Sequence, residues 1–483
     1  MLAKGISLLR LSFSNAIYII TIIILINIKQ QKLIKEKCMK KLLVSILSIM
    51  LVCVMAFGFT ACGDNSGGGG NTPGGTPPAV DAEGNTIVKI MFHVDKSSTE
   101  GQAYQKRLNA FNAAYKDRNI KAQGVFKARS AGASGYETEL LNNQLEGTLA
   151  DIITFDAPNT AAYAKSGLLY DISGLIPASE QEKFYSLNKY NGSLYGLPIQ
   201  ESSAGFFYNK KIFRAAGIDV SAFTAENPWN FAQFKEVCAR LKSFGKTPVD
   251  MRIDATKDET APYLLYPFIY AAGGEFTSTD GYTATGYYNS SATVKGFQFI
   301  KDLISAGYTS YAIGPTDFFT EKVGMYLSSG WTIPDLDNKY RENFASRDDW
   351  GLLPYPKDVV AASATGSWSY AITNNHHTDK TAIVELLNWM TSAESSKAIT
   401  DATGMIPARK DVVTNYAVGS PEYTLLKQLE VSGRERPVTV AYPTFSLTFN
   451  QVIAGLGTNE VSSLLNSATN TLQAEMDRLK KLN

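Results

Sequence analysis

Few residues in this sequence form the patterns that enzymes use for covalent or metal chemistry. The chain has three histidines, His93, His376 and His377, and the sequence contains no HExxH pair. It also contains no G-x-S-x-G turn and no phosphate-binding glycine loop. The segment Asp335–Lys339, "DLDNK", begins like a calcium loop but lacks the glycine and the terminal glutamate of that loop. We therefore expect no metal, no cofactor and no nucleophilic catalysis.

Carboxylates are the residues that could still do chemistry. Asp95 and Asp156 each follow a short apolar run, and Glu201 follows the segment "YGLPIQ". Two carboxylates about 5–10 Å apart could hydrolyse a glycosidic bond. Carboxylates can equally accept hydrogen bonds from sugar hydroxyls, with aromatic rings under the apolar sugar faces. Asp156 could also cap the helix that follows it. A secreted glycoside hydrolase and a carbohydrate-binding protein both remain open at this point.

The elements that would position these carboxylates alternate between strands and helices. Runs rich in β-branched residues predict strands at 86–94, 119–126 and 150–157. Apolar residues at helical spacing predict helices at 100–117 and 136–147. This order predicts a doubly wound α/β lobe with a mainly parallel sheet, in which ligands bind at the carboxyl ends of the strands. His93, Asp95 and Asp156 would lie at that edge.

Several later segments carry clear helix signals. Asn230 and Gln233 form a capping-box pattern before "FAQFKEVCARL", and Cys238 lies on the apolar stripe of that helix as a buried structural thiol. Further amphipathic helices are predicted in 378–399 and 458–482. With 483 residues the chain is too long for one ordinary core, so we expect two lobes.

The net charge of +1 conceals an uneven distribution. Residues 1–61 contain eight of the 46 basic and one of the 45 acidic residues, which leaves 38 basic and 44 acidic residues in the remainder. A nucleic-acid-binding protein would instead show a basic excess. We therefore expect no nucleic-acid partner.

The first 84 residues read as a targeting region and a tether. From Met39, "MKKLLVSILSIMLVCVMAFGFTAC" has a basic start, an apolar stretch and small residues before Cys62, as a secretory signal does. A Gly/Ser/Pro-rich tether follows at 62–84. A transmembrane anchor ending at Cys62 is the alternative. Residues 1–38 are interpreted as an upstream extension from a start codon assigned too early, and a second anchor is the alternative.

An ordered series of segments resembles one protein family. "DIITFDAPNTAAYAKSGLLYDIS" (Asp151–Ser173) and "YNGSLYGLPIQESSAGFFYNKKIFRAAGID" (Tyr190–Asp219) are similar to segments of bacterial extracellular solute-binding proteins of the sugar type. "PWNFAQFKEVCARLK", "TEKVGMYLSSGW", "WGLLPYP", "GSWSYAITNNHHTDKTAIVELLNWM" and "TGMIPARKDV" follow in the family's order. Ser193 and Glu321 depart from the family pattern. The end of the signal resembles a lipobox, which implies lipid attachment at Cys62, although Phe59 replaces the usual leucine.

The resemblance implies a two-lobe α/β fold with a ligand cleft between the lobes. It places residues 85–202 and 369–409 in lobe 1, and residues 203–368 and 410–483 in lobe 2. Hinges are expected near Glu201–Tyr208, near Trp368 and near Ala408–Val412. The residues implied to contact ligand are Asp95, Asp156, Glu201, Trp331, Trp368 and Tyr442.

The implied function is that of a lipid-anchored receptor of an ABC importer. It would bind a sugar or oligosaccharide as a monomer outside the cytoplasm and deliver it to a membrane permease. An acidic substrate would call for a cluster of arginines, and none is evident in the sequence. A surface protein for sensing or adhesion is a further alternative.

Overall fold

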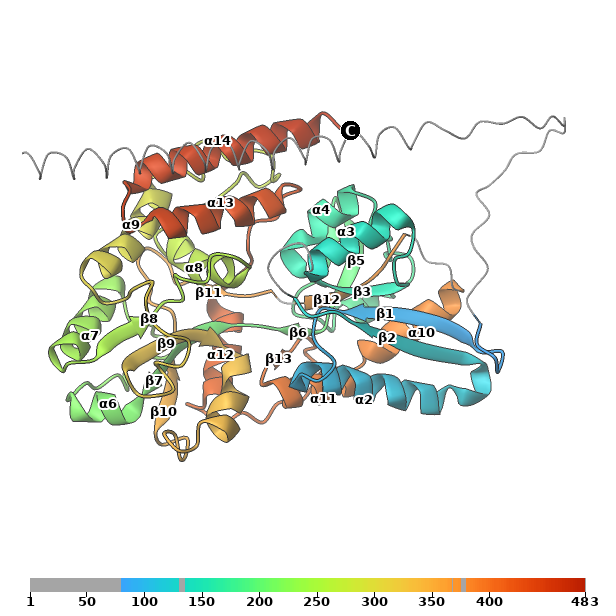
Figure 1. Cartoon of the computed structure of the whole chain (residues 1–483), viewed down its shortest axis with the longest axis horizontal. Helices are drawn as coiled ribbons and strands as arrows, with labels where there is room; N and C mark the ends of the chain where they lie inside the picture. Colours follow the sequence, from blue (N-terminus) through green and yellow to red (C-terminus); the bar gives the residue numbers. More distant parts are fainter. Residues whose placement is uncertain (1–79, 130–134, 367, 375–378, 483) are drawn as a thin grey trace, which may run out of the picture. The chain divides into compact units, whose positions relative to one another are not determined.

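The computed structural model describes residues 80–129, 135–366, 368–374 and 379–482, which belong to one compact unit, Gly75–Asn483. The predicted signal, most of the tether, Cys62 and the pair His376–His377 lie outside the described residues. Two main sheets, each covered by helices, make up this part of the chain (Figure 1).

The first sheet has six strands and contains the ends where His93 and Asp156 lie. In spatial order they are β2 (Ile120–Phe126), β1 (Thr86–Phe92), β3 (Ile152–Asp156), β12 (Trp368–Ile372), β5 (Ser193–Pro198) and β4 (Asn188–Tyr190). β1 pairs in parallel with both β2 and β3, as the sequence predicts. The other three pairings, β3–β12, β12–β5 and β5–β4, are antiparallel. The prediction of a mainly parallel sheet is therefore wrong, because β12 enters from a distant part of the chain.

Both faces of the first sheet are covered by helices (Figure 1). Alternate side chains of β1 point to opposite faces, as in any strand. Val88 and Phe92 pack in one apolar cluster, while Met91 packs in another. The first cluster includes residues of α2 (Thr99–Ala114), α10 (Lys380–Met390) and α11 (Ala393–Thr403). The second includes residues of α3 (Tyr136–Glu146) and α4 (Thr160–Lys165).

The second sheet has four strands, ordered β10 (Trp350–Leu353), β7 (Ala204–Asn209), β9 (Val323–Ser329) and β8 (Thr247–Asp250). The neighbours Phe206 and Phe207 pack into different clusters on its two faces. The larger cluster includes residues of α7 (Phe231–Ser243), α8 (Thr260–Ala271), α9 (Ser291–Ser305), α13 (Tyr442–Gly455) and α14 (Val461–Lys480). The smaller cluster includes Leu425 of α12 (Pro421–Ser432).

Two small sheets accompany the passages of the chain between the main ones. β6 (Gln200–Glu201) lies between strands of the first and second sheets and pairs antiparallel with β13 (Ile406–Pro407). β11 (Ser363–Ala364) pairs in parallel with β14 (Gly433–Arg434). The short helices are α5 (Ala178–Gln181), α6 (Lys210–Ala215), η1 (Lys116–Arg118), η2 (Ala157–Asn159), η3 (Gly330–Thr332) and η4 (Asp335–Lys339).

Two glycines bring backbone segments into direct contact. Gly330 follows β9, and Gly404 ends α11 with a left-handed φ of 73°. A Cβ atom on Gly330 would meet the carbonyl oxygen of Gly404 at 2.2 Å, and one on Gly404 would meet that of Gly330 at 2.6 Å. Real Cβ atoms do not approach other atoms this closely, so no side chain fits at either position.

The local helix signals in the sequence are confirmed. Asn230 caps α7, and Gln233 completes the reciprocal capping box. Cys238 is buried in the same helix, and burial raises the pKa of its thiol well above the ordinary value. Within the described ranges, no helix combines the length and the apolar character needed to cross a membrane.

Candidate functional site

Residues of the first sheet, together with residues of η3 and α8 beside the second sheet, line a cavity of about 290 Å³, called here the central cavity. Of the six residues implied to contact ligand, Asp156, Trp331 and Trp368 line it. The other lining residues are His93, Glu100, Arg129, Gln200, Ser202, Asp258, Glu259, Thr260, Tyr263, Gly366, Thr403, Met405 and Arg436. The cavity therefore lies at the carboxyl ends of β1 and β3, where the sequence places the ligand.

Trp368 lies beside Asp156 in the sheet, because the two residues are paired in the register of β12 and β3. The imidazole of His93 stacks on the Trp368 ring with centroids 3.4 Å apart and planes inclined by 5°. The guanidinium carbon of Arg129 lies 5.0 Å from the centroid of the same ring. One face of Trp368 is thus occupied by a protein side chain.

Trp331 presents a more open ring to the central cavity. It lies in η3, directly after Gly330, and 43% of the residue is exposed. Its nearest aromatic neighbour is Tyr263, with centroids 5.9 Å apart and an interplanar angle of 45°. An exposed ring in a lined cavity can stack on the apolar face of a sugar.

A chain of ion pairs runs through the wall of the cavity. Arg436 binds Asp156 with two hydrogen bonds, Nη2 to Oδ1 at 2.6 Å and Nη1 to Oδ2 at 3.0 Å. Its Nη1 also donates to Oε2 of Glu259 at 2.9 Å. Burial alone would lower the pKa of Arg436, but the adjacent carboxylate of Asp156 and Tyr442 hold that pKa well above the ordinary value. The three charged groups therefore stabilise one another in a buried position.

Tyr442 does not line the central cavity, but it binds Glu259, a member of this series of ion pairs. It is buried at the start of α13, and its hydroxyl donates to Oε2 of Glu259 at 2.6 Å. Ser446, one turn further along α13, donates to the other oxygen of Glu259. Tyr442 therefore contacts the site indirectly, through its hydrogen bond to Glu259, which lines the central cavity.

Arg129 extends the series of ion pairs on the other side of Asp156. Its Nε lies 2.6 Å from Oε1 of Glu137, and its Nη2 lies 3.7 Å from Oδ2 of Asp156. Arg129 and Arg436 therefore approach the same carboxylate from distant parts of the sequence. Neither arginine stands out in the sequence, because neither lies in a motif that predicts a contact with Asp156.

His93 lines the central cavity and stacks on the ring of Trp368. Its Nδ1 lies 3.1 Å from Thr154 Oγ1, and its Nε2 lies 3.7 Å from Oε1 of Glu100. Burial, assisted by the charge of Arg129, lowers the pKa of His93 well below its usual value. Burial also raises the pKa of Glu100. A neutral imidazole stacks on Trp368 at neutral pH.

Glu201 and Asp95 lie away from the cavity lining. Glu201 is completely buried in β6, where Ser186 and Thr365 donate to its carboxyl group. Burial raises its pKa to about 7. Asp95 is exposed and accepts hydrogen bonds from the backbone and side chain of Ser97, at 2.8 and 2.6 Å. Asp95, Asp156 and Glu201 therefore have separate sets of partners.

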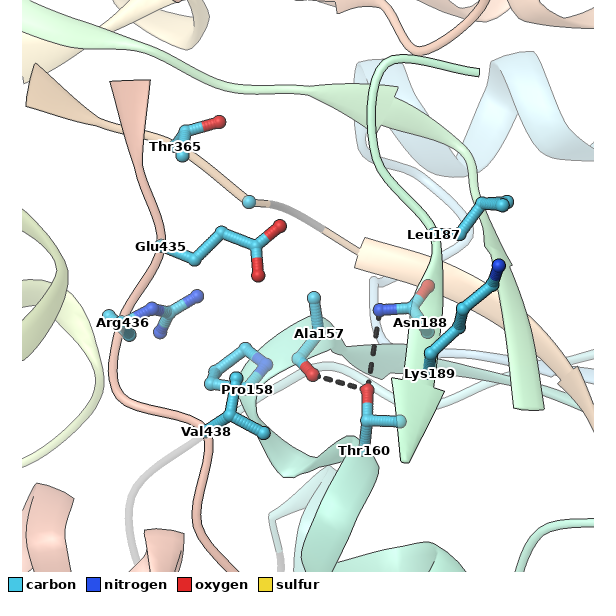
Figure 2. A pocket seen from close by; sticks show the side chains of 11 residues that line it. Ala157, Pro158, Thr160, Leu187, Asn188, Lys189, Thr365, Glu435, Arg436 and Val438 are labelled. Atoms are coloured by element: carbon cyan, nitrogen blue, oxygen red, sulfur yellow. Dashed lines mark hydrogen bonds between the residues drawn. The ribbon is translucent and has the colours of Figure 1, made fainter. Parts of the chain in front are cut away.

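Two further cavities adjoin the central cavity. One, of about 540 Å³, shares Arg129, Asp258 and Glu259 with it. The other, of about 40 Å³, shares Gly366 and Arg436. Figure 2 shows this small cavity, with Glu435 on one side and Asn188 reaching Thr160 on the other. The three cavities are thus adjacent, and Arg129, Asp258, Glu259, Gly366 and Arg436 lie between the central cavity and its two neighbours.

The fold and the site together define a two-lobe binding protein. A family profile described as bacterial extracellular solute-binding protein matches residues 106–429. The chain therefore belongs to the family of bacterial extracellular solute-binding proteins. It is accordingly a binding protein that acts outside the cytoplasm and not an enzyme, which decides against the glycoside hydrolase.

Individual relatives are distant in sequence. A putative binding protein of Brucella abortus (strain 2308) is 24% identical over 302 residues, which cover 60% of this chain and 71% of that protein. The sn-glycerol-3-phosphate-binding periplasmic protein of Escherichia coli (strain K12) is 23% identical over 330 residues, 64% of this chain and 71% of that protein. The crystal structure of a cyclic alpha-maltosyl-1,6-maltose binding protein from Arthrobacter globiformis aligns with a TM-score of 0.67 and 23% identity, covering 82% of this chain and all of that one.

Proposed function

We propose that this protein is the extracellular receptor of an ABC importer, and that it binds a neutral sugar or oligosaccharide in the central cavity for delivery to a membrane permease. The observation that carries this proposal is the pairing of the open Trp331 ring with hydrogen-bonding side chains in one cavity. Rings supply stacking surfaces and carboxylates supply oriented acceptors for hydroxyls. The similarity to a binding protein for a cyclic maltosyl-maltose supports the same ligand class.

A phosphorylated ligand is the second candidate, because the relative from Escherichia coli is named for binding sn-glycerol-3-phosphate. Arg129 and Arg436 would be the natural phosphate ligands. However, Arg436 is paired with Asp156 and Glu259, and Arg129 is paired with Glu137. A phosphate would have to displace a carboxylate to reach Arg436, and the charge of Arg129 is already balanced by Glu137 and by Asp156 at 3.7 Å. Charge compensation within the cavity therefore favours a neutral polyol.

The ligand class is tested by thermal shift and calorimetry on the purified protein. Neutral mono- and oligosaccharides should raise the melting temperature in a concentration-dependent manner. sn-Glycerol-3-phosphate at the same concentrations should raise it less. A shift with the phosphate and none with any neutral sugar would contradict the proposal.

We propose that lobe 1 comprises residues 85–202 and 369–409, and that lobe 2 comprises residues 203–368 and 410–483. The division of the strands between two main sheets supports this assignment. The passage of the chain through β6, β11 and β13 supports hinges near the predicted positions. Ligand that contacts both lobes would shift the population toward a closed state. We expect the protein to act as a monomer.

We also propose that the mature protein begins at Cys62 and is anchored to the membrane by lipid. The signal from Met39 and the tether after Cys62 support this proposal. Cys62→Ser should abolish lipid labelling and release the protein from the membrane fraction. A Cys62→Ser protein that stays membrane-bound at the wild-type level, with its N-terminus uncleaved, would indicate a transmembrane anchor instead.

A further inference from the structure

The larger of the two adjoining cavities, called here the outer cavity, lies between helices of the two proposed lobes. Its walls come from α3 and α4 on one side, and from α13 and the residues just before α8 on the other. α4 and α13 are in contact (Figure 1). Its volume of about 540 Å³ is within the range of about 300–1,000 Å³ typical of small-molecule sites. Because it shares three wall residues with the central cavity, one extended ligand could occupy both.

A buried acceptor without a partner lines the outer cavity. Asn450 of α13 is 7% exposed, and its Nδ2 donates to the backbone carbonyl of Asp258 at 2.9 Å. That bond fixes the orientation of the amide, because the oxygen could not donate to a carbonyl. Among the described residues no donor reaches the buried Oδ1 of Asn450. A buried acceptor left without a donor is unfavourable, so this position calls for a donor from a ligand.

Arg129 lies at the boundary between the two cavities. Its Nε faces Glu137 at 2.6 Å, and its Nη2 lies 3.7 Å from Oδ2 of Asp156, which is beyond hydrogen-bonding distance. Because Arg129 lines both cavities, its terminal nitrogens can donate to an oxygen of a ligand that extends from one cavity to the other. Glu259, whose carboxylate is an acceptor, also lines both cavities.

Apolar side chains complete the outer cavity. Leu141 of α3 is 49% exposed and Leu447 of α13 is 57% exposed, and both line it. Large apolar side chains left open next to isolated hydrogen-bonding groups suit a sugar ring, which has both C–H faces and hydroxyl edges. The charged groups of the wall include both signs, Arg129 and Lys257 against Glu137, Asp258 and Glu259. This wall has no excess of positive charge that would attract an anion.

We propose that the outer cavity is a second saccharide subsite, so that the ligand is an oligosaccharide with one unit in the central cavity and a further unit beyond Arg129. A hydroxyl of the further unit donates to Oδ1 of Asn450. This inference rests on the proposed function, since it extends the same binding site. It assigns Ala162 and Asn450 to the binding of long ligands only.

The test compares ligand lengths in a variant that fills the outer cavity. Ala162 of α4 lines that cavity, whereas Ala164 of the same helix lines a different one, and both are half-buried. Ala162→Met and Ala164→Met are therefore a matched pair. The probes are the mono-, di-, tri- and tetrasaccharides of α- and β-linked glucans, mannans, xylans, galactans and fructans, measured by isothermal titration calorimetry.

The wild-type protein should bind the tri- or tetrasaccharide of one series at least about tenfold more tightly than its monosaccharide. Ala162→Met should remove most of that difference and leave the affinity for the monosaccharide unchanged, while Ala164→Met changes neither. Asn450→Leu, with melting temperature as a check of folding, should weaken only the longer ligands, by about five- to tenfold.

The outcomes separate this inference from the proposed function. Equal affinity for short and long members of a series, or no effect of Ala162→Met, overturns the second subsite and leaves the sugar receptor standing. No binding of any saccharide in the panel overturns the sugar receptor, and the second subsite with it.

Discussion

Trp331 and Trp368 both line the central cavity, but they offer different surfaces to a ligand. Trp331 is 43% exposed, whereas one face of Trp368 is occupied by His93 at 3.4 Å. The residue with the open ring is the better stacking platform. Trp368, in contrast, stacks on His93 at the start of β12 and packs against both apolar clusters of the first sheet.

We expect Trp331→Ala to weaken saccharide binding by about 5- to 150-fold, since stacking of a ring contributes about 1–3 kcal/mol. The melting temperature should change little, because the ring is already partly exposed without ligand. Trp368→Ala is the control, and it should lower the melting temperature more than Trp331→Ala does. An unchanged saccharide affinity in Trp331→Ala would show that Trp331 does not stack on the ligand.

The bidentate pair of Asp156 and Arg436 should couple the two residues energetically. Both side chains are almost fully buried, with exposed fractions of 5% and 3%. Removing one partner of a buried pair leaves an uncompensated charge and costs about 3–5 kcal/mol. We expect Asp156→Asn and Arg436→Met each to lower the free energy of unfolding, measured by urea denaturation.

The loss of unfolding free energy in the double variant should be smaller than the sum of the losses in the two single variants. Each single variant leaves one charge of the pair unpaired, whereas the double variant removes both charges. Additive effects would show that the two side chains do not interact. Glu259 keeps its bonds from Tyr442 and Ser446 in all three variants.

The sequence predicted which residues lie at the ends of strands, but it did not predict which side chains form ion pairs with them. Asp156 and His93 line the cavity because Asp156 ends a strand and His93 directly follows one, which is a local pattern. Arg436 and Arg129 could not be predicted, because their role depends on which carboxylate the folded chain places beside them. A buried arginine has no sequence signature that separates it from a surface one.

At the scale of elements, β6 follows the last strand that the chain contributes to the first sheet before it enters the second. It contains Glu201, whose carboxyl group is completely buried. Burial raises the pKa of Glu201 from an ordinary 4.5 to about 7, and the charge of Glu435 adds to this effect. Ser186 and Thr365 donate to the carboxyl group and oppose the shift. Glu201 therefore keeps its proton in the folded state at pH values where the unfolded chain has lost it.

The sign of the pH effect follows from this difference. Between about pH 4.5 and 7 the folded state binds one proton more than the unfolded state, so the contribution of Glu201 to stability falls as pH rises. The change is roughly 3 kcal/mol over the interval. Glu201→Gln should have a flatter profile of unfolding free energy against pH, with its advantage over the wild type largest near pH 8.

The control is Glu182→Gln, which changes an exposed glutamate and should leave the profile unaltered. The measurement is urea denaturation at intervals from pH 4 to pH 9. Parallel profiles for the wild type and Glu201→Gln would contradict a protonated Glu201.

Elements with local signals were predicted well, and elements that depend on distant pairing were not. The capping box of α7 involves residues three positions apart, so the sequence contains the whole signal. β12 inserts between β3 and β5, and its antiparallel direction depends on how the chain returns after the second sheet. No local pattern specifies that return.

At the scale of the whole molecule, the proposed lobes predict a change of shape on binding. Small-angle scattering of the purified protein should show a smaller radius of gyration in saturating saccharide than without it. The saccharide is the one that gives the largest thermal shift, and a non-binding sugar at the same concentration is the control. An unchanged radius together with confirmed binding would contradict closure of two lobes.

The contact between Gly330 and Gly404 has a mechanical consequence for such closure. Side chains at an interface can change rotamer and so absorb a small displacement, but two backbones in contact cannot. In the proposed closure, the segment after β9 and the end of α11 would therefore act as the pivot between the lobes. A rotation of a few degrees about this pivot would displace atoms in proportion to their distance from it, so the rims of the cleft would move far and Trp331, directly beside Gly330, would move little.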